Sequence, residues 1–421
     1  MIEQGRAPGF WLGVAVTWFA AFNLRTGLIG VGPILPNLRD DLALSATQAS
    51  FLVALPTAMI GLAAVPGGRM VDRLGARLVI GAGLVFVALG GGLRAVAPGY
   101  WLLILLTLLF GAGVGVAQAG MPRVARGIAP GRIGLATAVY SGGFFTGSVL
   151  SAFVTAPLLL PLTSNRTWRL PLLVWGALAT LGLVAWLSSL SFWQLRAERV
   201  VTASRGLLRD ADTDRRWSPW RDLDVWVVAT VFLGQGVVYY LLIAWLPAAY
   251  DGLGMSEGVS GALFALFNLG TFPGMVGLPA VADRLGRRRT AVLIGSGATL
   301  IGVIGLAVAA DAQPWQWIWP FLAGFGVGGL FSLGMVLTVD VAPAGDTGRV
   351  AGMVLAVGYL GSATGPVIGG VIRDLTGSFH TALAVLPAIG LVMVVLSFFT
   401  PETARRRTVL PVAAGSEENR A

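Results

Sequence analysis

Hydrophobic residues fall into twelve long blocks along the chain, and short polar segments separate the blocks. Each block has roughly 20 residues, enough for a helix to cross the ~30 Å hydrocarbon layer of a bilayer. The pattern therefore predicts an all-α membrane protein with twelve spanning helices. The blocks cover approximately residues 11–35, 49–67, 78–96, 101–121, 133–157, 168–190, 225–249, 258–281, 290–310, 315–339, 349–372 and 380–400.

The composition agrees with this pattern. Hydrophobic residues make up 56% and charged residues 12% of the 421 residues, and the mean hydropathy is +0.79. One water-soluble core of this length could not bury so much apolar surface. The first block follows a short polar segment with Glu3 and Arg6, lacks a small-x-small cleavage site, and continues into Pro33 and Pro36. We therefore expect a retained helix and not a cleaved signal peptide.

The 29 basic residues are all arginines, and their distribution predicts the orientation of the chain. If the N-terminus is cytoplasmic, Arg25 alone lies deep within a block, five arginines lie in outer loops or at outer block ends, and the remaining 23 lie in inner loops and tails or at inner block ends. Because cytoplasmic loops are enriched in basic residues, both termini are predicted to be cytoplasmic. The net charge of +9 then reflects the orientation of the chain in the membrane and does not indicate a nucleic-acid-binding surface. The five outer arginines are Arg39, Arg94, Arg166, Arg169 and Arg373.

An internal repeat appears when the chain is aligned with itself at an offset of 211 residues. Leu35-Pro36 then matches Leu246-Pro247, and the tetrapeptide Asp-Arg-Leu-Gly at 72–75 matches the same tetrapeptide at 283–286. Two halves of six helices in the same orientation are typical of secondary transporters whose solute site lies between the halves near the midplane. The predicted parts are a first six-helix bundle at 1–190, a cytoplasmic linker at 191–224, a second bundle at 225–404 and a cytoplasmic tail at 405–421.

Two loop motifs carry a family resemblance. The segments GGRMVDRLGAR (67–77) and PAVADRLGRRR (279–289) resemble the repeated loop motif of the major facilitator superfamily, and GYLGSATGPVIGG (358–370) is a further similar piece. The resemblance implies two six-helix bundles that expose a central cavity alternately to the two sides of the membrane. In that family the motif is associated with conformational gating, although some of its arginines serve topology alone. The implied gating residues are Asp72, Arg73, Arg77, Asp283 and Arg284.

A narrower resemblance comes from NLRTGLIGVGPILPNLR (23–39), GAGVGVAQAGMPRVAR (111–126) and LIAWLPAAYDGLGMS (242–256). These segments are similar to the branch that contains bacterial cyanate transporters and 2-nitroimidazole transporters. The resemblance implies a carrier in a bacterial inner membrane, and it leaves the solute open because members of the branch are assigned different solutes.

Arg25 lies about 14 residues into the first block, where inserting an arginine costs about 2.5–3.5 kcal/mol. All 20 acidic residues lie in loops, in tails or near helix ends, so none is available at this depth. In the alignment of the two halves, Gly236 matches Arg25, so the charge occurs in one half only. A guanidinium keeps its proton and offers a planar fork of donors, which suits a small anion or a strongly dipolar solute. The alternative is a structural arginine that binds backbone carbonyls.

Asn23 and Arg25 cannot both point into the cavity, because two residues along a helix differ by about 200° in direction. We expect Arg25 to face the cavity and Asn23 to be either a solute contact or a hydrogen bond between helices. Other polar or aromatic side chains near mid-depth can pack between helices or touch solute. The candidate solute contacts are Arg25, Asn23, Tyr140, Gln235, Tyr239, Tyr240, Asn268 and Tyr359.

The glycine runs at 111–120 and 324–329 lie within blocks and follow no strand, so they predict close helix packing and not dinucleotide loops. We find no metal-ligand set and no nucleophile–base pair in the sequence, and therefore predict no enzyme activity, no cofactor and no metal. We expect a monomer that binds a small solute and the bilayer, but not nucleic acid. Three functions stay open: transport of a small anion such as cyanate, efflux of nitro-aromatic or drug-like compounds, and solute sensing. The coupling ion and the direction of transport also stay open.

Overall fold

The computed structural model describes residues 8–128, 133–163, 167–197, 218–342 and 347–402. Within these residues, twelve helical segments are long and apolar enough to cross a membrane, and no strand occurs. The prediction of an all-α protein with twelve spanning helices is thus confirmed. Most of the predicted linker and all of the tail at 405–421 lie outside the described residues.

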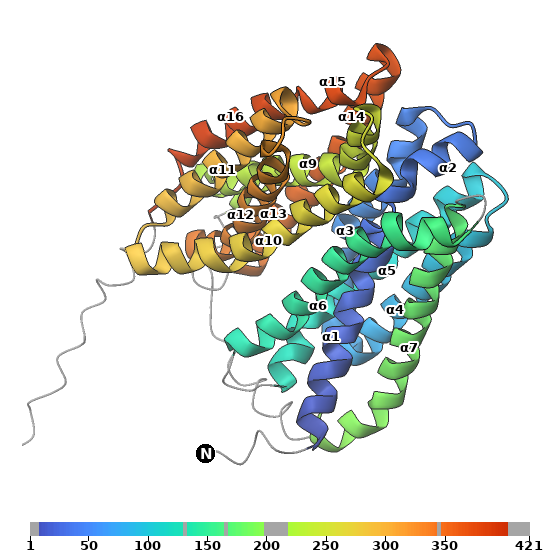
Figure 1. Ribbon diagram of the computed structural model, residues 1–421. Coiled ribbons are helices and arrows are strands. Elements are labelled where there is room, and N and C mark those ends of the chain that lie inside the picture. The colour runs from blue at the N-terminus through green and yellow to red at the C-terminus, as the bar shows by residue number, and fades with distance from the viewer. Residues whose placement is uncertain (1–7, 129–132, 164–166, 198–217, 343–346, 403–421) are drawn as a thin grey trace, which may run out of the picture.

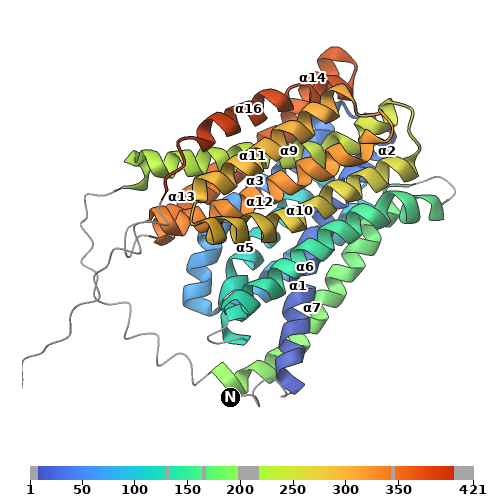
Figure 2. The same ribbon diagram turned by 60° about the vertical axis from the view of Figure 1, so that its left-hand side comes forward.

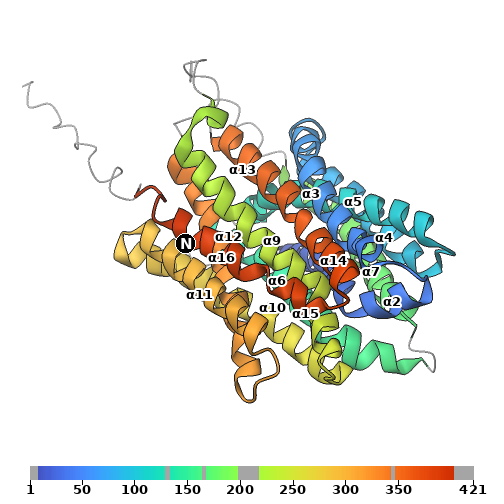
Figure 3. The same cartoon turned by 90° about the horizontal axis from the view of Figure 1, so that it is seen from above.

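The first bundle contains six spans, and several of them consist of two consecutive helices. Seen from above, most of its helices lie on one side of the molecule (Figure 3). Its helices are α1 (Pro8–Ile29), α2 (Leu35–Asp41), α3 (Ala46–Leu74), α4 (Ala76–Leu93), α5 (Tyr100–Ile128), α6 (Ile133–Val154) and α7 (Arg169–Ala197), with short helical turns at Gly32–Ile34, Arg94–Val96, Thr155–Leu159 and Leu160–Leu162.

The second bundle contains the other six spans, and the last two of them are each divided into two helices. Its helices are α9 (Leu223–Gly252), α10 (Glu257–Leu285), α11 (Arg288–Val308), α12 (Ile318–Val341), α13 (Thr347–Ser362), α14 (Thr364–Thr376), α15 (Phe379–Leu383) and α16 (Leu386–Ser397), with short turns at Pro219–Arg221 and Trp315–Trp317. The predicted domain boundaries at 190 and 225 stay a prediction, although α7 continues as far as Ala197 and α9 begins at Leu223.

The internal repeat is visible in α3 and α10, whose first and last residues both differ by 211 (257 − 46 and 285 − 74). Each helix starts with a serine, Ser45 or Ser256, whose hydroxyl accepts a hydrogen bond from the backbone three residues later. Each ends at the glycine of the loop motif, Gly75 or Gly286, with φ of 87° and 61°. A positive φ is unfavourable for most residues other than glycine, which explains the glycine of both motifs.

Glycines set the spacing of helices within each bundle. Gly270 and Gly274 of α10 lie against α12, and Gly324 and Gly328 of α12 lie against α10, so that a Cβ at any of these four positions would overlap a backbone carbonyl of the other helix. Such reciprocal pairs of small residues four apart allow helices in membranes to approach closely. The prediction that the second glycine run packs helices is confirmed.

The two bundles are close together at one end and spread apart at the other (Figures 1 and 2). We call the end with the start of α1 and the end of α16 the terminal face, and the end with α2 and the α14–α15 turn the distal face. Near the distal face, Gly32 lies against the carbonyl oxygen of Ile243, and Gly261 lies against Ala156 and Pro157. The protein is therefore closed at the distal face.

The glycine contacts generate a first prediction. Replacing Gly274 by Ala should lower the melting temperature by several degrees, because overfilling a packed helix contact costs roughly 1–3 kcal/mol. Gly277 of the same helix has no atom within 4 Å of the position of a Cβ, so Gly277→Ala is the matched control and should leave the melting temperature unchanged or raise it. Thermal unfolding of both variants in detergent checks this, and equal melting temperatures would contradict the packing argument.

Candidate functional site

The first span is interrupted near its middle. Helix α1 ends at Ile29, and the chain continues through a short turn at Gly32–Ile34 into α2. Pro33 and Pro36 lie at the starts of these later elements, where a missing N–H is tolerated. The whole span covers Phe10–Asp41, so Arg25 lies at its centre, just before the interruption.

Arg25 lies between the two bundles, and the residue is only 8% exposed. Its guanidinium carbon lies 5.1 Å from the centroid of the Phe144 ring in α6 of the same bundle. The side chains of Tyr239, Tyr240 and Tyr359 lie close to the guanidinium, and that of Tyr240 lies within hydrogen-bonding reach. These three tyrosines come from the second bundle, so the site is made by both halves of the chain.

The charge of Arg25 has no acidic partner among the described residues. The ion pairs formed there join Arg39 to Asp40, and Arg288 to Asp283 and Asp340. The ring face of Phe144 and the phenol oxygens stabilise a cation, but they carry only partial negative charge. A guanidinium has five N–H donors, and these neighbours use few of them. The site is thus positively charged and keeps donors for an anion.

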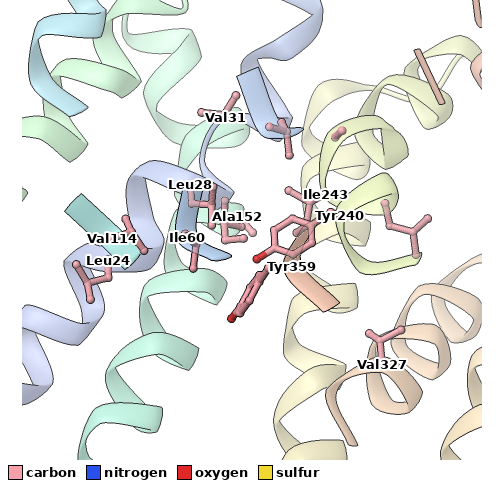
Figure 4. Close-up of a cluster of buried hydrophobic side chains, with 14 of the residues drawn as sticks. Leu24, Leu28, Val31, Ile60, Val114, Ala152, Tyr240, Ile243, Val327 and Tyr359 are labelled. Atoms are coloured by element: carbon pink, nitrogen blue, oxygen red, sulfur yellow. The ribbon is translucent and has the colours of Figure 1, made fainter. Parts of the chain in front are cut away.

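A second layer of polar side chains orients the tyrosines. Gln118 of α5 donates from its side-chain amide to the hydroxyl of Tyr359 at 3.3 Å. The hydroxyl of Tyr239 donates to Asn268 at 3.5 Å, and Asn268 in turn donates to the carbonyl of Phe264 at 3.0 Å. The Tyr240 and Tyr359 rings project from the second bundle toward Leu28, Ile60 and Ala152 of the first (Figure 4). The sequence did not predict a role for Gln118, because this residue lies in the glycine run at 111–120, which predicts close packing of helices.

Asn23 does not join this cluster. Its side chain is fully buried, donates to the carbonyl of Phe19 at 2.8 Å and lies against Gly182 of α7. Arg25 therefore faces the second bundle while Asn23 faces the interior of the first, as the helical geometry requires.

The remaining two candidates lie at the edge of the cluster. Tyr140 packs edge-on against Phe144, with ring centroids 5.8 Å apart, so it supports the ring beneath Arg25. Gln235 is buried one turn before Tyr239 in α9, and therefore shares the helix face of that tyrosine.

The loop-motif residues lie at the terminal face. Arg73 and Arg284 are exposed, Arg77 is half-buried, and the side chain of Asp72 lies outside the described part of the structure. Asp283 pairs with Arg288, which also binds Asp340 at 3.0 Å. The backbone N–H of Arg288 donates to Glu402 at 3.1 Å. All of these partners belong to the second bundle, so in this conformation the second motif holds its own bundle together.

A second arginine is buried near Arg25, and the expectation that Arg94 lies in an outer loop is wrong. Arg94 is 2% exposed at the end of the span Ala76–Val96. Its guanidinium donates to the carbonyl of Gly27 at 3.0 Å and lies 4.3 Å from the centroid of the Phe110 ring. Gly27 is in the last turn of α1, where carbonyls lack helical partners. Arg94 therefore caps α1 beside the interruption.

Comparisons with known proteins agree with this fold. The sequence profile of the Major Facilitator Superfamily matches residues 17–359 and 248–417. The cyanate transport protein CynX of Escherichia coli (strain K12) is 30% identical over 383 residues, which cover 89% of this chain and 94% of that protein. The 2-nitroimidazole transporter of Escherichia coli (strain K12) is 27% identical over 379 residues, covering 89% of this chain and 91% of that protein. The resemblances inferred from the sequence motifs are confirmed.

A solved structure supports the same fold. The crystal structure of a D-xylose-proton symporter matches 94% of this chain and 98% of its own, with a TM-score of 0.69 and 16% sequence identity. Identity this low bears on the fold alone.

The role of Arg94 generates a second prediction. Arg94→Met should lower the melting temperature, because the carbonyl of Gly27 loses its buried donor, at a cost of about 1–3 kcal/mol. Arg73→Met removes an exposed arginine of the same bundle and should have almost no effect. Thermal unfolding in detergent compares the two variants. An unchanged melting temperature for Arg94→Met would show that the buried guanidinium does not stabilise α1.

Proposed function

The chain belongs to the Major Facilitator Superfamily, and on that premise we propose that it carries a small anion across a bacterial inner membrane. The family and its relatives make it a transporter and not an enzyme. The observation that carries the proposal is the guanidinium of Arg25 at the centre of the first span, without a carboxylate partner among the described residues. A buried charge of this kind is costly unless an opposite charge or hydrogen-bond partners compensate it. A transported anion would do so each time it binds.

The donors around the site favour an oxyanion or a pseudohalide. The fork of Arg25 can bind two atoms of one anion at once, and a lysine could not do so with the same geometry. The hydroxyls of Tyr240 and Tyr359 can donate to the anion from the opposite side, because a phenol both accepts and donates. Since one relative is a cyanate transport protein, we take cyanate as the first solute to test.

The position of the site between the bundles supports alternating access. An anion held by Arg25 of α1 and by the tyrosines of α9 and α13 would join the two bundles at their centre. Rocking of one bundle against the other around this point would then open the distal and terminal faces in turn. By the distribution of arginines we place the terminal face, with both termini, in the cytoplasm. One chain supplies both halves of the site, so we propose a monomer as the working unit.

A second candidate is efflux of a small nitro-aromatic compound. Tyr239 packs edge-on against Tyr240, with centroids 5.1 Å apart, and near Phe267 at 5.7 Å, so aromatic faces lie close to Arg25. One relative is named as a 2-nitroimidazole transporter. A nitro group is strongly dipolar and could also accept from the guanidinium.

Substitution of Arg25 tests the anion site directly. Arg25→Lys should weaken cyanate binding by about tenfold, because the charge stays but the bidentate fork is lost, and Arg25→Ala should abolish binding at millimolar cyanate. Binding is measured by calorimetry on monodisperse protein, and transport by counterflow in proteoliposomes. The chain has no lysine of its own, so mass spectrometry must confirm that cyanate has not modified the new lysine during the measurement.

The matched control is Arg39→Ala, which removes an arginine of the same span near the distal face. It should retain cyanate affinity. Near-normal affinity in folded Arg25→Ala would contradict the anion site and would favour a structural arginine.

Thermal stabilisation by ligand separates the two candidate functions. A ligand that binds only the folded protein raises its melting temperature, and the rise grows with the ratio of ligand concentration to dissociation constant. We expect cyanate to raise the melting temperature of the native protein but not that of Arg25→Ala. Stabilisation of both proteins by 2-nitroimidazole, with no effect of cyanate on either, would favour the nitro-aromatic candidate.

A further inference from the structure

A single carboxylate joins the two bundles at the distal face. Asp374, near the end of α14, accepts hydrogen bonds from the backbone N–H groups of Ala46 at 2.8 Å and Thr47 at 2.9 Å. It also accepts from the hydroxyl of Thr47 at 2.6 Å. Ala46 and Thr47 begin α3 in the first bundle, so these three bonds link residues more than 300 positions apart in the sequence.

The start of α3 is built so that it needs this partner. The hydroxyl of Ser45 accepts from the N–H of Gln48, and the side chain of Gln48 accepts from the N–H of Ser45. This capping box satisfies the donors at both ends of the first turn, but not those of Ala46 and Thr47 between them. The carboxylate of Asp374 binds both remaining donors. Its negative charge is also favoured at the positive end of the α3 dipole.

The backbone around Asp374 is shaped for this contact. Gly370 lies one turn before Asp374, and a Cβ there would come within 2.7 Å of the carbonyl oxygen of Ala46 and 2.9 Å of the Cα of Thr47. The two helices can therefore approach closely only because position 370 is a glycine. The neighbouring Arg373 has its guanidinium carbon 5.1 Å from the centroid of the Phe379 ring, and the guanidinium carbon of Arg39 in the first bundle lies 5.5 Å from the same centroid.

We propose that Asp374 is the gating residue of the distal face, outside both loop motifs, and that it stabilises the conformation in which this face is closed. Opening the distal face moves α14 away from α3 and breaks all three bonds at once. The N–H groups of Ala46 and Thr47 then bind water, and the capping box keeps the rest of the helix start intact. The inference does not depend on the identity of the solute, so it can fail or hold independently of the anion site.

The distance between the bundles at the distal face tests the proposal. The chain has no cysteine, so Pro98→Cys in the α4–α5 turn and Thr381→Cys in α15 introduce the only two sites for spin labels. Double electron–electron resonance on this pair in lipid nanodiscs gives the populations of the closed and open distal face. In Asp374→Ala we expect the ratio of open to closed to rise by about tenfold, the usual effect of losing hydrogen bonds to a charged group.

Three further variants make the test specific. Asp374→Asn and Thr47→Val each leave part of the contact, so both should give smaller increases than Asp374→Ala. Gly370→Ala should raise the open population by wedging the helices apart while leaving the carboxylate in place. Asp311→Asn is the matched control, an exposed carboxylate between α11 and α12 at the same face, and should change nothing.

The proposal fails if Asp374→Ala and Gly370→Ala both keep the distance distribution of the parent pair. It also fails if Asp311→Asn opens the distal face as much as Asp374→Ala does, because a general loss of negative charge would then be the cause. Size-exclusion chromatography confirms that each variant is folded. If Asp374→Ala does not fold, the ordering of Asp374→Asn, Thr47→Val and Gly370→Ala against Asp311→Asn decides the question.

Discussion

A positive charge at the middle of a membrane span has to be balanced, and this requirement organises the centre of the molecule. No described carboxylate balances Arg25. The ring of Phe144 and the tyrosine hydroxyls of the second bundle supply only partial negative charge. In the proposed function, a bound anion supplies the missing negative charge, and the partial charges of these neighbours support Arg25 when the anion has left.

Close backbone contacts occur both within and between the bundles, and polar side chains add to the contacts between them. Within the second bundle, glycines such as Gly274 and Gly324 bring helix backbones into direct contact, which makes the bundle rigid. Between the bundles, Gly32 and Gly370 also lie close to backbone atoms of the other bundle, and polar side chains such as Gln118 and Asp374 add hydrogen bonds. Polar contacts of this kind can break and form again when water reaches them. Opening of the distal face must therefore break polar contacts between the bundles, whereas each bundle can move as a unit.

Local features of the fold could be predicted from the sequence. Helix length follows from hydropathy, and the starts and ends of α3 and α10 follow from Ser45, Ser256 and the motif glycines, because caps depend on neighbours within a few residues. The opposite directions of Asn23 and Arg25 likewise follow from helical periodicity. The sequence also shows which half carries the central charge.

Features that depend on distant partners could not be predicted. From the sequence, Arg94 is predicted to lie in a loop. The carbonyl of Gly27 and the ring of Phe110, which stabilise its buried charge, belong to other helices and cannot be identified from the neighbouring sequence. Gln118 and Asp374 act on residues of the opposite bundle, and nothing in their local sequence indicates this.

The most direct test of an anion site at Arg25 is X-ray diffraction from crystals grown with selenocyanate, a linear anion that carries an anomalous scatterer. We predict an anomalous peak between the guanidinium of Arg25 and the hydroxyls of Tyr240 and Tyr359, and no such peak in Arg25→Ala crystals grown in the same way. A peak that lies elsewhere between the bundles, or one that persists at full height in Arg25→Ala, would contradict the account.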